Sequence, residues 1–241
     1  MARGLVRLAR GAWKIFCYAL GAAVVAVILV QGWYFAHVLW WRDHQPSASA
    51  FMKARVAQLR EKDPKARLVH QWVPYERIAV HLKRAVVASE DAKFVGHEGF
   101  DWESISKAIE RNEKKGRVVA GASTISQQLA KNLFLSGERS WFRKGQEAVI
   151  TWMLESALDK RRILELYLNY AEWGENGVFG AEAAARHHFR VNASALSAEQ
   201  AAYLAAILPS PRRYTPGRQT NYLRGRVETI RARMQGAQIP D

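Results

Sequence analysis

The sequence predicts a mainly α-helical protein, in which one compact domain follows a single N-terminal transmembrane helix. Three observations lead to this expectation. Residues 15–41 contain no charged side chain. Beyond residue 75, apolar residues recur at the spacing of three and four that places them on one face of a helix. Alternating strand patterns are almost absent. With 241 residues, 49% of them hydrophobic, the chain can build a packed core and is not globally disordered.

The N-terminal segment predicts a membrane anchor. A spanning helix needs about 20 apolar residues, and the uncharged run at 15–41 is longer and ends in a cluster of aromatic residues. Residues 1–14 carry four basic and no acidic side chains. The positive-inside rule therefore makes residues 1–14 a cytoplasmic tail and places the rest of the chain outside. The alternative is a cleaved signal peptide with a weak site in "SASA" at 47–50, but its apolar region would be unusually long.

The charge of the chain indicates an anionic partner. The net charge is +14, and the excess of cations continues after the basic tail. A domain outside the cytoplasm is a poor candidate for nucleic acid, so anionic lipid head groups and a diphosphate ligand remain. The only cysteine, Cys17, excludes a framework of internal disulfides.

Residues 42–70 are expected to form a connector, with a short basic helix that stops near Pro64. The domain is expected over 71–241. Its predicted helices cover 76–90, 101–114, 123–135, 141–158 and 160–172, with a short strand within 67–73. Asp101 is a predicted N-cap. Ser197 and Gln200 fit a capping box for a last helix that ends before Pro209.

Glu90 is the first candidate for chemistry, within "SEDAKFVGHEGFD" at 89–101. It ends an apolar helix, which places its carboxylate close to the core. Burial beside apolar surface raises the pKa of a carboxylate and lets it exchange protons near neutral pH. The alternative is an ordinary helix end with a charged pair and a surface histidine.

A second candidate is the polar face of the helix predicted over 123–135, within "GASTISQQLAKN". Its side chains are a hydroxyl, three amides and one ammonium group, where a solvated face would carry Glu and Lys pairs. Such a face suits a ligand with many oxygen atoms, such as a sugar or a phosphate. The alternative is a helix packed against polar loops.

A third candidate is "ERSWFRKGQE" at 138–147. Arg139, Arg143 and Glu147 share one strip of a helix, and Lys144 adds a third cation. The cluster suits an anionic group, although an intrahelical ladder of ion pairs would give the same pattern. The block 160–189 is interpreted mostly as scaffold, and no ligand spacing predicts a metal site. The four-residue match "SISK" at 104–107 to a transpeptidase motif carries little weight.

Together, five ordered stretches resemble the family 51 peptidoglycan glycosyltransferases. They are "EDAKFVGHEGFD", "GASTISQQLAKNLFL", "RSWFRKGQE", "RRILELYLNYAEWGENGVFGAEAAARHHF" and "LSAEQAAYLAAILPSPRRYTP", and they cover nearly all of residues 75–216. The anchored single-domain layout resembles the monofunctional members. The resemblance implies a lysozyme-like helical fold with a larger head and a small membrane-facing jaw.

The resemblance also implies an activity. Such enzymes polymerise lipid II, a disaccharide-pentapeptide on undecaprenyl diphosphate, with inversion at the donor sugar. By matching position, Glu90 resembles the general base and Glu147 a second carboxylate that assists at the donor side. The implied substrate-binding residues are Asp91, Phe94, His97, Ser123, Thr124, Gln128, Lys131, Asn132, Arg139, Arg143 and Lys144. No cofactor is required by the sequence, and the diphosphate leaves room for a divalent cation, Mg²⁺ or Mn²⁺.

Several further expectations follow from the resemblance. The enzyme would act at the cell inner membrane, have no transpeptidase activity and work beside other wall-synthesis or division proteins. The last motif lacks the lysine of bifunctional relatives, and either Arg212 or Arg213 could replace it. The candidate membrane contacts of the jaw are Phe134, Leu135, Trp141, Phe142 and Trp152. The rival functions are a lytic enzyme that cleaves glycan and a non-catalytic wall scaffold.

Overall fold

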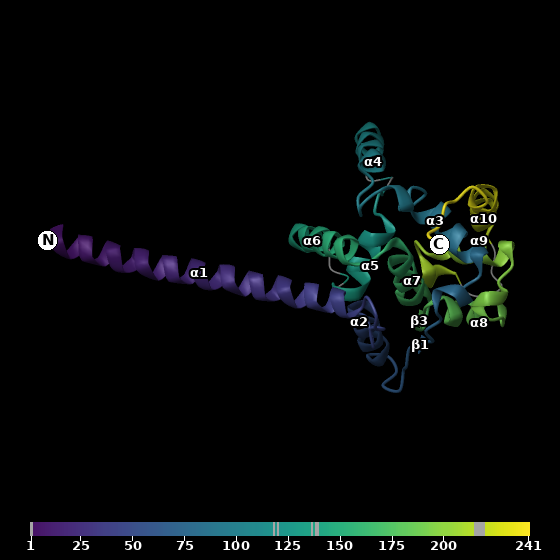
Figure 1. Cartoon of the computed structure of the whole chain (residues 1–241), viewed down its shortest axis with the longest axis horizontal. Coiled ribbons are helices and arrows are strands. Elements are labelled where there is room, and N and C mark those ends of the chain that lie inside the picture. The colour runs from purple at the N-terminus through teal and green to yellow at the C-terminus, as the bar shows by residue number, and fades with distance from the viewer. Residues whose placement is uncertain (1, 118, 120, 136, 138–139, 215–219) are drawn as a thin grey trace.

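The computed structural model describes residues 2–117, 119, 121–135, 137, 140–214 and 220–241, with side chains described from residue 10 onward. The fold is mainly helical, as the sequence predicts. Helix α1 (Ala2–Trp40) extends away from the domain, and only its C-terminal part reaches the other helices (Figure 1). Its segment Arg10–Trp40 is long and apolar enough to cross a membrane.

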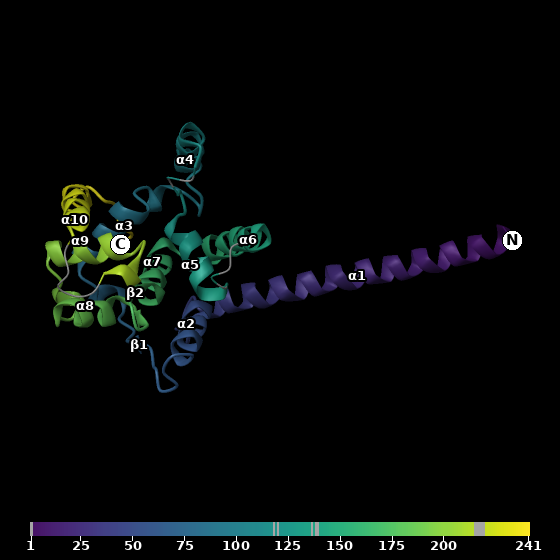
Figure 2. The ribbon, with the colours of Figure 1, turned by 180° about the vertical axis from the view of Figure 1, so that it is seen from behind.

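The domain has two groups of helices around one apolar core. In the first, α3 (Val80–Glu90) packs against α9 (Ala198–Ile207) and α10 (Asn221–Met234). In the second, α5 (Ile125–Phe134) packs against α6 (Trp141–Ala157) and α7 (Lys160–Tyr170). Figure 2 shows the second group on the side of the domain nearest to α1, while α10 lies at the far side.

The remaining elements are short or peripheral. Helix α2 (Ala50–Arg60) lies beside α5, α4 (Trp102–Lys115) projects from the body, and α8 (Ala181–Phe189) follows a small sheet (Figure 1). The strands are β1 (Val69–His70), β2 (Glu172–Gly174) and β3 (Val178–Phe179), in the order β1-β3-β2. Strand β1 is parallel to β3, and β2 is antiparallel to it. Single turns of 3-10 helix lie at Tyr75–Arg77, Phe94–Gly96, Ala193–Ala195 and Pro211–Arg213 (η1 to η4).

Several predicted boundaries shift, each for a local reason. The helix expected over 76–90 splits into η1 and α3, because Ile78 is extended and Ala79 donates a backbone hydrogen bond to Ala193. The helix expected over 160–172 ends at Tyr170, and Glu172 lies in β2. Strands β2 and β3 were missed, because two- and three-residue strands carry no alternation that can be recognised.

The predicted caps are confirmed. Asp101 accepts the backbone N–H of Ser104 at the start of α4, and Ser197 and Gln200 form a capping box at the start of α9. The hydroxyl of Ser104 also donates to Asp101, while Lys107 pairs with Glu103. The side chains of the "SISK" match are therefore used in capping and in a surface ion pair.

Candidate functional site

Glu90 ends α3 with its carboxylate turned toward the interior, and 10% of the side chain is exposed. The amide Nε2 of Gln128 in α5 donates to its Oε2 at 3.0 Å, and the hydroxyl of Ser89 donates to Oε1 at 3.2 Å. Burial raises the pKa of Glu90, while the Gln128 hydrogen bond and the charge of Arg226 oppose the rise. Such a carboxylate can accept a proton from a substrate hydroxyl.

The amide of Gln128 is oriented by Tyr167 of α7. The phenol donates to Oε1 of Gln128 at 3.0 Å, which leaves Nε2 as the end that meets Glu90. Burial raises the pKa of Tyr167 well above its usual value, so the phenol keeps its proton. In the sequence analysis, Tyr167 is treated as part of the scaffold block 160–189. Its hydroxyl was the signal, because a buried tyrosine usually finds a hydrogen-bond partner.

Arg226 of α10 also approaches Glu90. Its Nη2 donates to the hydroxyl of Ser89 at 3.2 Å and lies 3.9 Å from Oε1 of Glu90. This residue was also missed by sequence reasoning. An arginine in a basic C-terminal helix has the pattern of a solvated face, so no local pattern distinguishes Arg226 as part of a site.

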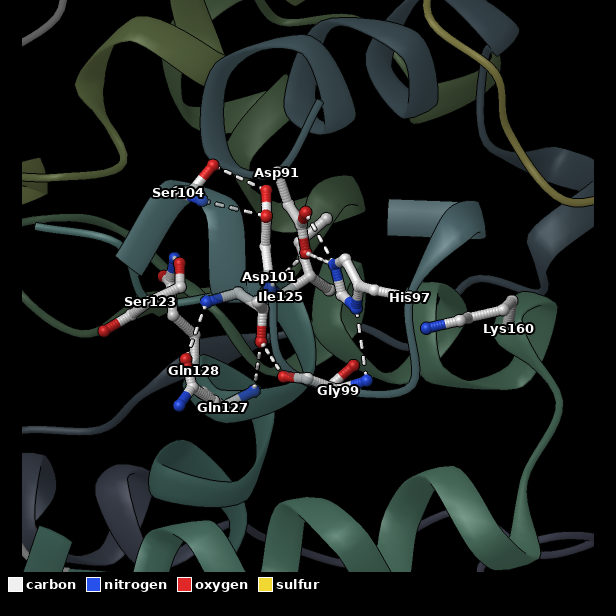
Figure 3. A network of polar contacts seen from close by, with 12 residues as sticks. Asp91, His97, Gly99, Asp101, Ser104, Ser123, Ile125, Gln127, Gln128 and Lys160 are labelled. Carbon is white, nitrogen blue, oxygen red and sulfur yellow. Dashed lines mark hydrogen bonds and ion pairs between the residues drawn. The ribbon is translucent and has the colours of Figure 1, made fainter. Parts of the chain in front are cut away.

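Asp91 links the end of α3 to the start of α5, as Figure 3 shows. Its carboxylate accepts the backbone N–H of Ile125 at 3.0 Å and contacts Nε2 of His97 at 2.9 Å. The backbone N–H of Gly99 donates to Nδ1 of His97, which places the proton of the neutral ring on Nε2. The hydroxyl of Thr124 donates to the carbonyl of Gly99 at 2.7 Å. The network holds the loop after Asp91 against α5.

Gly99 is required at its position in this loop. Its φ of +88° lies in the region that favours glycine, and an added Cβ would come within 2.8 Å of the Thr151 side chain.

Phe94 is fully buried, with Nζ of Lys160 4.6 Å from its ring centroid. Among the predicted substrate-binding residues, Phe94 thus supports the loop from inside, whereas Ser123 is exposed at the start of α5.

Glu147 of α6 is 3% exposed and lies between two cations. Nη1 of Arg143 lies 2.8 Å from one carboxylate oxygen, and Nζ of Lys144 bonds the other. The intrahelical ion pairs of the alternative interpretation therefore form, with Arg143 and Lys144 as their cations, and binding of an anionic group by this cluster stays a prediction. Arg139, the remaining predicted member, lies outside the described residues.

Lys131 of α5 interacts electrostatically with the carboxylates of both Glu90 and Glu147. Burial lowers the pKa of Lys131, and the charges of Glu147 and Glu90 both act to raise it. Both carboxylates therefore lie within electrostatic reach of α5, as expected of a shared site. Among the residues described, Lys131 has no hydrogen-bond or ion-pair partner of its own, so its ammonium group is available to an anion.

A cavity of about 350 Å³ lies beside these groups. Its lining includes Gln128, Lys131 and Asn132 of α5, Tyr167 of α7, Glu172 of β2, Phe51 of α2, and the segment 208–213. The amide-rich face of α5 is thus partly a cavity wall, as expected. The carboxylates of Glu90 and Glu147 do not line this cavity, and Glu90 is linked to it through its hydrogen bond with the lining residue Gln128.

Glu172 is a further residue that sequence reasoning treated as scaffold. It is buried between Arg55 of α2 and Arg212 of η4, each 2.9 Å from a carboxylate oxygen. Arg212 is thereby held in an ion pair. Arg213 also lines the cavity and has no ion pair within the part of the chain that the structure describes. Of the two arginines in the last motif, Arg213 is the one free to meet an anionic ligand.

A metal ion at the site would depend on ligands from the protein or from the substrate. Among the described residues, no three His, Cys, Asp or Glu side chains gather into a ligand set. A divalent cation held through the oxygens of a bound diphosphate would not need one, so Mg²⁺ or Mn²⁺ at the diphosphate stays a prediction.

A helical domain that combines a buried carboxylate, oriented amides and free cations around one cavity has the parts of a glycosyl-transferring enzyme. The family model described as transglycosylase matches residues 55–235. The biosynthetic peptidoglycan transglycosylase of Methylobacillus flagellatus is 59% identical over 227 residues, 94% of this chain and 99% of that protein. The protein of the same name from an Azoarcus species is 57% identical over 228 residues, 95% and 98% of the two chains.

One from Chromobacterium violaceum is 55% identical over 227 residues, 94% of this chain and 99% of that protein. The chain therefore belongs to the transglycosylase family and is a glycosyltransferase.

Proposed function

We propose that this chain is a peptidoglycan glycosyltransferase that polymerises lipid II into glycan with β-1,4 linkages. The family and the names of the relatives support the peptidoglycan transglycosylase class. The observation that carries the finer proposal is the Glu90 carboxylate, whose pKa is raised by burial and which Gln128 holds beside a cavity lined by cations.

In this mechanism Glu90 acts as general base. It takes the proton from the 4-hydroxyl of the GlcNAc of lipid II, and that oxygen attacks C1 of the MurNAc at the reducing end of the growing glycan. The new C–O bond forms as the bond from C1 to the diphosphate oxygen breaks, with inversion. Undecaprenyl diphosphate leaves with the electron pair. Oriented neutral donors around a buried carboxylate keep it ready for this transfer.

The cations of the site stabilise the negative charge that develops on the leaving diphosphate. Among the residues that the structure describes, the ammonium group of Lys131 has no bonded partner, and Arg143 and Lys144 are already fixed by Glu147. Cations that are held in place before the reaction stabilise developing negative charge without reorganisation. Glu147 thus assists at the donor side by orienting them. A divalent cation at the diphosphate would add to the same effect.

The setting follows from α1. A span at 15–41, which overlaps the apolar helix segment Arg10–Trp40, would anchor the protein in the inner membrane. Residues 1–14 would be cytoplasmic, and 71–241 would form the periplasmic catalytic domain after the connector 42–70. Lipid II, polyprenyl-linked glycan and the membrane are then the partners, with wall-synthesis or division proteins beside them and no nucleic acid. Cross-linking of stem peptides would belong to other proteins.

The test compares wild type with Glu90→Gln on labelled lipid II in detergent or vesicles. Wild type should build lengthening glycan, and Glu90→Gln should lose about 10²–10⁴-fold, the usual contribution of a general base. Glu113→Gln, an exposed carboxylate on α4, is the matched control and should keep full activity. Equal polymerisation by Glu90→Gln would refute the role of Glu90. Shortening of preformed glycan would indicate the lytic function. If folded wild-type protein leaves lipid II unchanged, the result would indicate a non-catalytic scaffold.

A further inference from the structure

The C-terminal part of α1 packs on the domain along one helix face. The contacting residues are Gln31, Tyr34, Val38 and Trp41, which recur every three or four positions. Val38 is fully buried and Trp41 is 9% exposed, whereas Leu29 and Leu39 on the same helix are 68% and 46% exposed. A face buried at this spacing is what a helix shows when it packs against a neighbour.

The partners of this face come from the elements that carry the candidate site. The ring of Phe134, at the end of α5, lies 5.2 Å from that of Tyr34 and 4.8 Å from that of Trp41, measured between centroids. Leu135 is 7% exposed and packs in the core, whereas Phe134 is partly buried and packs against the end of α1. Since Lys131 and Asn132 lie one turn earlier in α5, the seat of α1 is directly next to the cavity.

One polar pair lies on the same seam. The amide of Gln31 donates to Oε1 of Gln146 in α6 at 2.8 Å, and the amide of Gln146 donates back at 3.0 Å. Gln31 lies within the apolar segment Arg10–Trp40, where an unpaired amide is costly. A polar pair inside an apolar seam fixes the register of two helices, because slippage leaves both amides without partners.

The C-terminal end of α1 is held as well. Arg162 of α7 donates from Nε to the carbonyl of Trp41 at 2.9 Å and from Nη2 to the carbonyl of His44 at 2.6 Å. A guanidinium group there satisfies carbonyls that have no helical partner and complements the helix dipole. The hydroxyl of Tyr170 also bonds the carbonyl of Pro46. The chain that follows α1 is thus bonded to α7.

From these contacts we propose that α1 is a fixed part of the catalytic domain and that the Gln31–Gln146 pair is its positioning latch. Gln146 directly precedes Glu147, so the pair sets the rotation of α6 and the height of its cations along α1. A slip of one helical turn would move them by about 5.4 Å. This inference rests on the proposed function, because height matters only for a diphosphate held at a membrane surface.

The first experiment tests the docking without using activity. In a Cys17→Ala background, Gln31→Cys and Gln146→Cys are combined and treated in vesicles with a short bismaleimide. The latch predicts rapid cross-linking of this pair. The control pair, Gln31→Cys with Ser156→Cys near the far end of α6, should react far more slowly. Equal rates, or no cross-link, would overturn the proposal, whether or not the protein polymerises lipid II.

The second experiment tests the positioning role. Gln31→Leu and Gln146→Leu should each lose roughly 10-fold in kcat/KM on long-chain lipid II in vesicles, since small misplacements of reacting groups are costly. On a short-chain analogue in solution they should stay within about 2-fold of wild type. Gln71→Leu, an exposed amide, is the control. Equal losses on both substrates would show a merely structural role and overturn the proposal. Unchanged activity of the two leucine variants on both substrates would also overturn the proposal. Loss of activity only in vesicles by the cross-linked Gln31→Cys and Gln146→Cys protein would overturn it as well.

Discussion

Glu90 and Glu147 are both buried carboxylates, and their neighbours separate their roles. Glu147 has a cation on each oxygen, so its lone pairs are engaged. Glu90 has a neutral amide and a hydroxyl as its nearest partners, and Arg226 stays 3.9 Å away. A carboxylate without a close cation keeps a raised pKa and an accessible lone pair. The residue scale therefore favours Glu90 as the base and Glu147 as the organiser of cations.

The hydrogen bond from Gln128 should be visible in the pH dependence. It lowers the pKa of Glu90, so Gln128→Leu should raise that pKa further. Because the base works ionised, activity falls as pH drops through the pKa. The acid limb of log(kcat/KM) should therefore move to higher pH in Gln128→Leu, and less far in the same direction in Tyr167→Phe. A profile that only drops in height would show that the amide acts on substrate and not on Glu90.

The two arginines of η4 should behave differently. Arg213→Ala removes a cavity cation that has no ion pair among the described residues, and it should raise KM for lipid II about 10-fold, as loss of a charged hydrogen bond does. Arg212→Ala leaves Glu172 with Arg55 alone, so it should lower the thermal unfolding midpoint more than Arg213→Ala does. Kinetics and thermal melts of both variants check this. The reverse pattern would assign the ligand to Arg212.

At the scale of elements, the junction between α3 and α5 decides whether Glu90 and Gln128 meet. Asp91 accepts the first N–H of α5 and holds His97, and the Thr124–Gln127 capping box completes that helix start. The polar side chains of Asp91, His97 and Thr124 are therefore engaged in hydrogen bonds within the protein. Their predicted contact with substrate stays a prediction, and their observed contacts are those of supports.

This junction can be tested with one isosteric change. Asp91→Asn keeps the shape but removes the charge that faces His97 and the start of α5. We expect a loss of about 2 kcal/mol in unfolding free energy, or a fall of roughly 4–8 °C in the unfolding midpoint. Asp101→Asn is the matched control, because Asn caps a helix about as well as Asp. Equal midpoints for the two variants would argue against the junction.

At the scale of the whole molecule, we expect α1 and α6 together to form a membrane-facing side. Trp141 and Phe142 at the start of α6 are 93% and 86% exposed, and Trp152 further along is 63% exposed. Large apolar side chains this exposed on a helix beside an apolar span indicate contact with lipid. The candidate jaw contacts are thus divided: these three face outward, Leu135 is buried in the core, and Phe134 is partly buried against the end of α1.

A label at Trp141 should report this contact. In a Cys17→Ala background, an environment-sensitive dye on Trp141→Cys should shift to the blue and be quenched by brominated lipid. The same dye on Tyr222→Cys is the control. Tyr222 is 67% exposed, but α10 lies on the side of the domain remote from α1 (Figure 1). Equal quenching at both positions would contradict a membrane-facing α6.

The sequence by itself determined the helical class, the apolar N-terminal helix, the helix caps at Asp101 and Ser197, and the residues of the ordered motifs. These features are local: periodicity, capping and charge are written in neighbouring residues. Only the tertiary structure decided that Tyr167 orients Gln128, that Arg226 reaches Glu90, that Glu172 pairs with Arg212, and that Gln31 meets Gln146. Each of these pairs joins segments far apart in the chain, and no periodic pattern encodes which distant side chain will satisfy a buried polar group.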